Sequence, residues 1–313
     1  MMLWEEAEKT ALLGMEIYSF GLYCALGALL SLVMLLLLCQ REKMKKGTAP
    51  LMALCMMAGA MILSRLFFSL LDRSLGAMIP FKWALNLTTG GYSMVGALLG
   101  GALGAALAGK ISGQKPLRLA EIALPALLLF VACERLGEGT QLEFGVSRPL
   151  LGDALKGSFL SVEGDYDWYL ATYLLESFAA VILALVLLRD LSMKRRAGDT
   201  VLLALILYGA SQTVLESLRY DRHLSFSFVG AQHIAALLML GTAVIILAVR
   251  KLKTNKKLAL AAIVSIPLAA GLGVGLEFAI DRTEINRYLL YLIYILLIAA
   301  PAWMGVRLRK EGK

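Results

Sequence analysis

Charged side chains interrupt or adjoin several long apolar runs of this sequence, and most of them fall toward one end of those runs. They are Arg65, Glu134, Arg135, Glu176, Glu216 and Arg219. A charge at membrane depth is costly, seldom faces lipid and usually marks a functional cavity. Guanidinium groups bind phosphate oxygens through paired N–H donors, and a low dielectric constant strengthens the interaction. The pattern therefore predicts a cavity for an anionic lipid headgroup.

Structural explanations of single residues remain open. Glu134 and Arg135 could form an interfacial pair, and Arg65 with Glu176 could form a buried ion pair between helices. His233 is either a proton acceptor or a hydrogen-bonded structural residue, because a lone histidine at a helix end serves both purposes.

The elements that must position these residues are membrane spans. The chain has 313 residues, of which 59% are hydrophobic and 17% charged, far more apolar than a soluble domain. Apolar stretches of about 20 residues are long enough to cross a bilayer, and there the backbone can be satisfied only as helices. The fold class is therefore an all-α polytopic membrane protein of about nine transmembrane helices. We expect them at about 17–39, 50–72, 91–109, 117–137, 168–189, 199–218, 227–250, 258–278 and 287–307.

Basic residues gather in alternate connections, which predicts the orientation. The basic stretches are 41–46, 110–118, 189–196, 250–257 and 307–313. By the positive-inside rule, the N-terminus is outside and the C-terminus cytoplasmic. The net charge of +8 is then explained by topology and anionic lipid, so no nucleic-acid partner is expected.

Depth along the spans places the charges in the outer leaflet. At 1.5 Å per helical residue, Arg65 lies about 10 Å below the outer end of the second span. Glu176 lies about 12 Å below the outer interface if the fifth span begins at Trp168. Arg135 and Arg219 end two spans that run outward. A phospholipid could therefore enter the predicted cavity sideways from the outer leaflet.

Three smaller patterns complete the outline. Residues 1–12 begin acidic, unlike a cleavable signal, and we expect a short amphipathic helix on the outer surface within a segment 1–15. Gly96, Gly100 and Gly104 follow a four-residue spacing that permits close approach of another helix. The four cysteines lie in apolar spans without metal-ligand spacing, so we expect neither a metal nor a cofactor.

Two stretches resemble motifs of the prolipoprotein diacylglyceryl transferase family. GGYSMVG at 90–96 is similar to the family's GG-x-S-x-H-G, with Gly90, Gly91 and Ser93 matching. RLGEGTQLE at 135–143 is similar to R-x-G-N-x-x-N-G-E, with Arg135, Gly137 and Glu143 matching.

Single residues of four further spans also match the family. They are Arg65 in SRLFF, Glu176 in YLLES, Glu216 and Arg219 in ESLR, and Gly230 with Gln232 at the start of the seventh span. The resemblance covers roughly residues 16–252. It implies a seven-helix core there, with two additional helices and a basic tail at 253–313.

The resemblance implies an enzyme of the bacterial inner membrane. The family moves a diacylglyceryl group from phosphatidylglycerol to the cysteine thiol of a prolipoprotein signal peptide. Arginines would hold the phosphate of phosphatidylglycerol, or of another anionic phospholipid, and neutralise the departing glycerol phosphate. Arg135, Glu143 and His233 are the predicted catalytic residues, His233 as a base for the thiol. The predicted substrate-binding residues are Arg65, Gly90, Gly91, Ser93, Glu176, Glu216, Arg219 and Gln232.

Some family positions differ in this chain. Val95 stands where the family has histidine, Gln212 where it has a further arginine, and Glu138 and Gln141 where it has asparagines. A second hypothesis is therefore a paralogue that binds lipid or a lipidated partner without the reaction. A third is a small-anion or lipid transporter. It would need polar residues toward the inner face, where the spans are almost wholly apolar.

Overall fold

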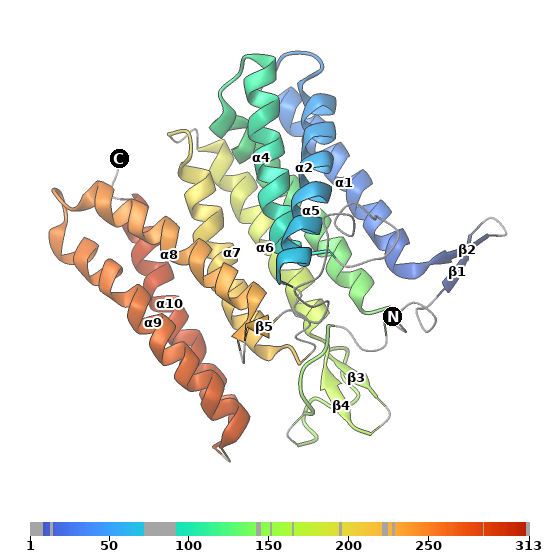
Figure 1. The fold of residues 1–313 in the computed structure, drawn as a ribbon, viewed down its shortest axis with the longest axis vertical. Helices are drawn as coiled ribbons and strands as arrows, with labels where there is room; N and C mark the ends of the chain where they lie inside the picture. The colour runs from blue at the N-terminus through green and yellow to red at the C-terminus, as the bar shows by residue number, and fades with distance from the viewer. Residues whose placement is uncertain are drawn as a thin grey trace. The chain divides into compact units, whose positions relative to one another are not determined.

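The described residues of the computed structural model form an all-α membrane protein (Figure 1). Residues 9–12, 15–71, 92–141, 145–150, 152–164, 166–193, 196–220, 225–226, 229–283 and 285–310 are described. Each predicted span falls on a helix. The helices are α1 (Ser19–Arg41), α2 (Thr48–Leu71), α4 (Met94–Ser112), α5 (Pro116–Glu138), α6 (Thr172–Ser192), α7 (Asp199–Leu218), α8 (Ala231–Lys251), α9 (Lys256–Arg282) and α10 (Arg287–Lys310). Within the described residues, eight of them are long and apolar enough to cross a membrane; α6 is not one of the eight.

The described residues also contain three short antiparallel hairpins, one before α1 and two between helices. They pair β1 (Lys9–Leu12) with β2 (Met15–Tyr18), β3 (Ser161–Glu163) with β4 (Trp168–Leu170), and β5 (Ser225–Phe226) with β6 (Val229–Gly230). The amphipathic helix expected over residues 1–12 is wrong for Lys9–Leu12, because this segment pairs with β2 as a strand; residues 1–8 lie outside the described residues.

The hairpins also correct two predicted span boundaries. Trp168–Leu170 belongs to β4, so the fifth span begins at Thr172 rather than at Trp168. Glu176 therefore lies about 6 Å from the start of its helix, at 1.5 Å per residue, instead of about 12 Å. The seventh span likewise begins at Ala231, after β6. Apolar strand residues extended both predicted spans because hydropathy does not distinguish the two conformations.

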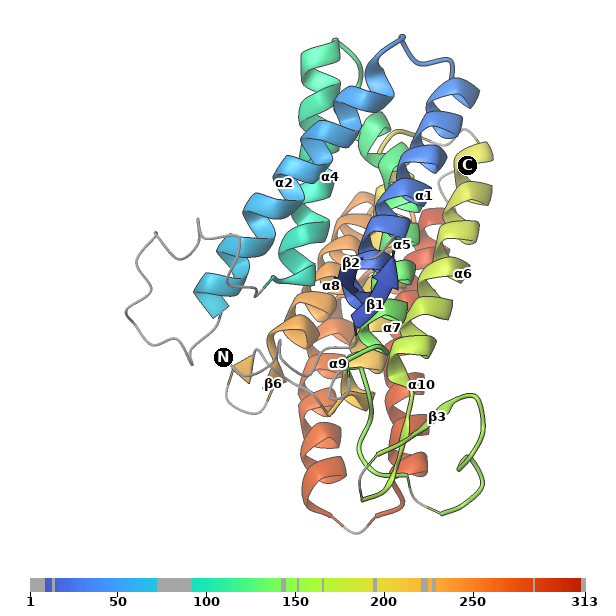
Figure 2. The ribbon, with the colours of Figure 1, turned by 90° about the vertical axis from the view of Figure 1, so that its right-hand side faces the viewer.

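The chain divides into two compact units. The first unit comprises Met1–Ala197 with Leu218–Leu224, and the second comprises Gly198–Ser217 with Ser225–Lys313. In the first unit, α5 contacts α1, α4 and α6 (Figure 2). Its core is built from apolar side chains that include Leu35, Met52, Leu119 and Ile122.

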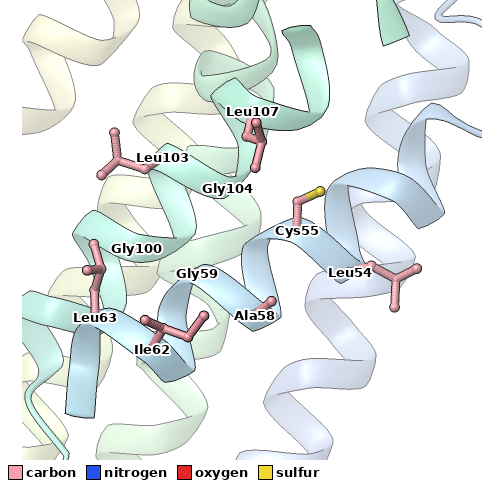
Figure 3. Close-up of a pocket in the computed structure, with 10 residues that line it drawn as sticks. All are labelled: Leu54, Cys55, Ala58, Gly59, Ile62, Leu63, Gly100, Leu103, Gly104 and Leu107. Carbon is pink, nitrogen blue, oxygen red and sulfur yellow. The ribbon is translucent and has the colours of Figure 1, made fainter. Parts of the chain in front are cut away.

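The glycine stripe of α4 packs directly against α2, as its spacing predicts. A Cβ atom at Gly96, Gly100 or Gly104 would collide with the backbone of α2, at Leu63, Gly59 and Cys55 respectively. Beside this contact lies an open groove with a volume of about 550 Å³ (Figure 3). Its lining consists of apolar residues and glycines: Leu54, Cys55, Ala58, Gly59, Ile62, Leu63, Gly100, Leu103, Gly104 and Leu107. Such a lining offers no group that could bind a phosphate.

The second unit consists of α8, α9 and α10 together with most of α7. Helices α8, α9 and α10 contact one another in pairs. Gly209 of α7 packs on the backbone of α8 at Ala236 and Leu240. The core includes Ile206, Leu240, Val244, Tyr294 and Ile298. The last two helices are thus packed into a shared core with α7 and α8.

Candidate functional site

Two arginines and two glutamates of the first unit form a closed ring of ion pairs. Arg135 Nε lies 2.9 Å from Glu176 Oε2, and Arg135 Nη1 pairs with Glu138 Oε1. Arg219 Nη1 lies 2.9 Å from Glu138 Oε2 and 3.1 Å from Glu176 Oε1. Each carboxylate therefore bridges both guanidinium groups. We call Arg135, Glu138, Glu176 and Arg219 the arginine–carboxylate ring.

Helices α5 and α6 position three members of the ring. Arg135 and Glu138 are three residues apart on the last turn of α5, which places both side chains on one face. Glu176 lies one turn into α6. Ser177 next to it donates a hydrogen bond of 2.8 Å from Oγ to the carbonyl oxygen of Ala132, which joins the two helices at this level.

The backbone of the segment after α5 positions Arg219, the fourth member of the ring. Arg219 directly follows α7 and forms an isolated antiparallel bridge with Ser147. The N–H group of Tyr220 donates to the carbonyl oxygen of Val146 at 3.0 Å. Gly145 accepts hydrogen bonds from the Tyr173 N–H group at 2.8 Å and from Thr172 Oγ1 at 2.5 Å. The first turn of α6 and Arg219 are therefore anchored on the same short segment.

The ring is buried and formally neutral when all four groups are ionised. The exposed fractions of the side chains are 2% for Arg135, 1% for Glu176, 6% for Arg219 and 13% for Glu138. Burying these charges costs free energy, which the ion pairs offset only because each group has an opposite partner. Glu134 adds a carboxylate 3.4 Å from Arg135 Nε. The structure thus brings together two of the three predicted phosphate-binding arginines, already oriented by carboxylates.

Arg65 and Ser93 lie at another contact, between α2 and the start of α4. The guanidinium carbon of Arg65 is 5.4 Å from the centre of the Tyr92 ring, within range of a cation–π interaction. Ser93 is buried and caps α4, because its hydroxyl accepts from the Gly96 N–H group at 3.4 Å. Its own N–H group donates to the Ser64 carbonyl oxygen at 3.1 Å. The predicted residues Gly90, Gly91 and Glu143 lie outside the described residues.

The other predicted residues belong to the second unit. Glu216 is buried on α7, and a Cβ at Gly230 would lie 3.1 Å from its Oε1, so the glycine makes room for this carboxylate. Gln232 is half-buried at the start of α8, and His233 is buried beside it. His233 Nε2 lies 2.5 Å from the Tyr294 hydroxyl, and Nδ1 lies 4.0 Å from Glu277 Oε1.

Sequence reasoning missed Glu138 as a site residue. The sequence analysis identifies it only as a residue that stands where the family has asparagine. The helix continues to Glu138, and its three-residue spacing from Arg135 was the available signal. Tyr294 and Glu277 were missed as partners of His233 because only packing brings α9 and α10 to α8.

Among the described residues, no group of three or more histidine, cysteine, aspartate or glutamate side chains could hold a metal ion. Cys24, Cys39, Cys55 and Cys133 are free thiols. The ring itself offers paired guanidinium and carboxylate groups, which can bind and orient an anion.

Comparison with known proteins agrees with the resemblance seen in the sequence. The family model described as prolipoprotein diacylglyceryl transferase matches residues 9–250. The phosphatidylglycerol–prolipoprotein diacylglyceryl transferase of Bacillus velezensis is 26% identical over 255 residues, which cover 76% of this chain and 90% of that protein. The proteins of the same name from Bacillus licheniformis and Bacillus cereus are 26% and 29% identical, covering 76% and 73% of this chain and 89% and 85% of their own lengths. The ring lies within the matched region, and the chain belongs to the prolipoprotein diacylglyceryl transferase family.

Proposed function

We propose that this protein transfers a diacylglyceryl group from phosphatidylglycerol to the cysteine of a prolipoprotein. The observation that carries the proposal is the buried arginine–carboxylate ring, located inside the region that the family model matches. The family and its named relatives favour a transferase over the non-catalytic paralogue. The transporter hypothesis gains no support from the ring, whose charges are gathered at one end of α5 and α6.

Arg135 and Arg219 would bind the lipid phosphate. The ion pairs of Arg135 use Nε and Nη1, and a guanidinium carries two further N–H donors on Nη2. Glu138 and Glu176 would hold the two guanidinium planes in place before the lipid arrives. Preorganised donors of this kind stabilise the charge that develops on a leaving phosphate without reorganisation during the reaction.

The reaction needs one bond to form and one to break. The cysteine thiol loses its proton, and its sulfur forms a thioether bond to the terminal glycerol carbon of the diacylglyceryl group. That carbon's bond to the phosphate oxygen breaks, and glycerol phosphate leaves with the electron pair. Arg135 and Arg219 would neutralise the leaving group. Arg65, Gly90, Gly91, Ser93, Glu143, Glu216 and Gln232 remain proposed contacts of lipid or peptide.

The proposed location is the bacterial inner membrane, with the ring toward the outer leaflet. Helix α5 begins next to the basic stretch 110–118 and ends at Glu138, so the ring lies at the end of α5 away from those basic residues. By the positive-inside rule, that end faces outward. The signal peptide of a prolipoprotein would present its cysteine on the same side.

The direct test is transfer of labelled diacylglycerol from phosphatidylglycerol to a signal-peptide substrate in proteoliposomes. Wild-type protein should produce labelled peptide and release glycerol phosphate. Arg135→Ala should abolish transfer, whereas Lys156→Ala should retain it, because Lys156 pairs with exposed Asp153 in the segment between α5 and α6. Complementation of a strain depleted of its own transferase gives an independent readout. Absence of transfer by folded wild-type protein would contradict the proposal.

A further inference from the structure

The groove beside the contact of α2 and α4 has a floor of glycines and walls of apolar side chains. Gly59, Gly100 and Gly104 lie between the two rows of side chains (Figure 3). The walls are exposed residues of both helices: Leu54 and Ile62 on α2, and Leu103 and Leu107 on α4. Because the glycines carry no side chain, the groove reaches down to the backbone where the helices touch. Its shape is that of a narrow slot for an elongated apolar group.

The groove follows the direction in which lipid chains run. On α2 it extends from Ile62 to Leu54, eight residues or about 12 Å at 1.5 Å per residue. Helix α2 is long and apolar enough to cross a membrane, and spanning helices are tilted by only about 20° from the bilayer normal. Helix α2 begins after the basic stretch 41–46, so the positive-inside rule turns the Ile62 end of the groove toward the outer leaflet.

A cation lies one turn beyond the outer end of the groove. Arg65 follows Ile62 by three residues, which places it on the same side of α2. Its guanidinium carbon is 5.4 Å from the centre of the Tyr92 ring. The Ser93 N–H group donates to the Ser64 carbonyl oxygen at 3.1 Å, which holds the start of α4 at this level of α2. Arg65 is buried, so its charge acts through a low dielectric constant rather than through water.

The size of the groove distinguishes a hydrocarbon chain from a peptide helix. A volume of about 550 Å³ along about 12 Å gives a mean cross-section of about 46 Å². An α-helix with its side chains is about 10–12 Å across, which is a cross-section of about 80–110 Å². The groove is therefore too narrow for a transmembrane helix of a signal peptide or of a second copy of this chain, whereas an extended acyl chain is thinner than a helix.

We propose that the groove between α2 and α4 binds an acyl chain of an anionic phospholipid, with Arg65 attracting the headgroup to its outer end. The apolar lining suits the chain, and the cation beyond it complements the negative headgroup. The identity of this lipid as phosphatidylglycerol, the donor of the diacylglyceryl group, rests on the proposed function. The surrounding bilayer is as apolar as the groove, so the preference comes from close packing and from the charge of the headgroup.

Photo-crosslinking in phosphatidylcholine nanodiscs locates the bound chain. The probes are phosphatidylglycerol and phosphatidylcholine that carry the same diazirine in one acyl chain, and mass spectrometry identifies the labelled residues. The phosphatidylglycerol probe should label Leu54, Leu103 and Leu107 more strongly than exposed Leu29 of α1. The phosphatidylcholine probe should label both places evenly. The same pattern from both probes would identify ordinary bilayer lipid and overturn the proposal.

Competition and matched variants test the occupant. Unlabelled phosphatidylglycerol should displace the probe from the groove; displacement only by a lipoprotein signal peptide would assign the groove to the peptide and contradict the proposal. Ala58→Phe places a ring in the groove at an exposed position, and should abolish labelling of α4. Ala28→Phe adds the same ring to an exposed position of α1 and should not. Unchanged labelling in Ala58→Phe would overturn the proposal.

Arg65→Gln tests the charge at the outer end. This variant should lose the preference for the phosphatidylglycerol probe over the phosphatidylcholine probe, because the apolar groove remains while the cation is gone. A full preference in folded Arg65→Gln would contradict the role of Arg65. If the variant does not fold, the comparison of the two probes on wild-type protein still decides whether the groove selects an anionic lipid.

The transfer assay tests the link to the reaction. Many weak contacts along a chain add up, so Ala58→Phe should raise KM for phosphatidylglycerol by about fivefold or more with kcat unchanged. Ala28→Phe should change neither constant. An unchanged KM in Ala58→Phe would show that the groove does not bind the donor lipid. If folded wild-type protein has no transfer activity, the proposed function fails, while the crosslinks still decide whether the groove binds an anionic phospholipid.

Discussion

Two buried polar clusters among the described residues stabilise their polar groups in different ways. The arginine–carboxylate ring contains four charges that cancel in pairs, each carboxylate contacting both arginines. The cluster of His233, Tyr294 and Glu277 contains a hydrogen bond between two groups that can both be neutral, with the Glu277 carboxylate 4.0 Å from the imidazole. Removing one ring member leaves a buried charge without one of its partners, whereas Tyr294→Phe removes a hydrogen bond between uncharged groups.

This difference predicts different costs of substitution in the two clusters. Substitutions in the ring should lower both the free energy of unfolding and the transfer rate. Tyr294→Phe, which removes one hydrogen bond between uncharged groups, should lower the free energy of unfolding by only about 1 kcal/mol. A result in which both clusters respond alike would remove the basis of the comparison.

The largest effect is expected from Arg135→Ala. It leaves Glu138 and Glu176 buried with one cation between them, and breaking a buried pair in this way costs about 3–5 kcal/mol. Unfolding in mixed micelles measures the loss. Lys156→Ala, which removes an exposed ion pair, serves as the control and should have no measurable effect. Equal stability of Arg135→Ala and wild type would show that the ring is not maintained in the membrane.

Glu138→Gln should have the next largest effect. The amide keeps the shape of the side chain but loses the charge that pairs with both arginines, at a cost of about 2 kcal/mol for charge-assisted hydrogen bonds. The ring then carries a net positive charge, so phosphatidylglycerol should bind more tightly. Glu134→Gln is the matched control, because Glu134 contacts only Arg135 in the ring, at 3.4 Å. Weaker lipid binding by Glu138→Gln would argue against phosphate binding at the ring.

Gly100→Ala tests the packing of α2 on α4 in the same unit as the ring. A methyl group there collides with the Gly59 backbone, and overpacking of this kind costs about 1–3 kcal/mol. Gly21→Ala on α1 is the control, because nothing lies within 4 Å of a Cβ at that position. Stability of the two variants is compared in the same micelles. Unchanged stability of Gly100→Ala would mean that α2 and α4 can move apart without a cost in free energy.

The smallest effect is expected from Ser177→Ala. This change removes the hydrogen bond from α6 to the Ala132 carbonyl oxygen of α5, worth about 1 kcal/mol. Ser192→Ala removes a hydroxyl that bonds within α6 and should be neutral. A decrease in transfer by Ser177→Ala larger than its stability loss would indicate that the spacing of α5 and α6 sets the geometry of the ring.

Much of the architecture could be predicted from the sequence because hydropathy is a local signal. Each predicted span falls on a helix, and the stripe of Gly96, Gly100 and Gly104 correctly indicated a close helix contact. The starts of α6 and α8 were wrong by about four residues, since apolar strand residues precede both helices. The strand at Lys9–Leu12 was missed because its partner lies in the same short segment and amphipathicity alone favoured a helix.

The sequence by itself determined the class of membrane protein, the charged residues at the ends of the spans and the resemblance to one family. The tertiary structure decided which of those charges meet. Arg135 and Arg219 share Glu176, and also Glu138, whose part in the ring was missed. Arg65 lies against Tyr92, at the contact between α2 and the start of α4. His233 contacts Tyr294 and lies near Glu277, on helices that follow it in the chain. Hydropathy depends on residues close in sequence, whereas ion pairs and hydrogen bonds between helices depend on atoms that only helix packing brings within a few ångströms.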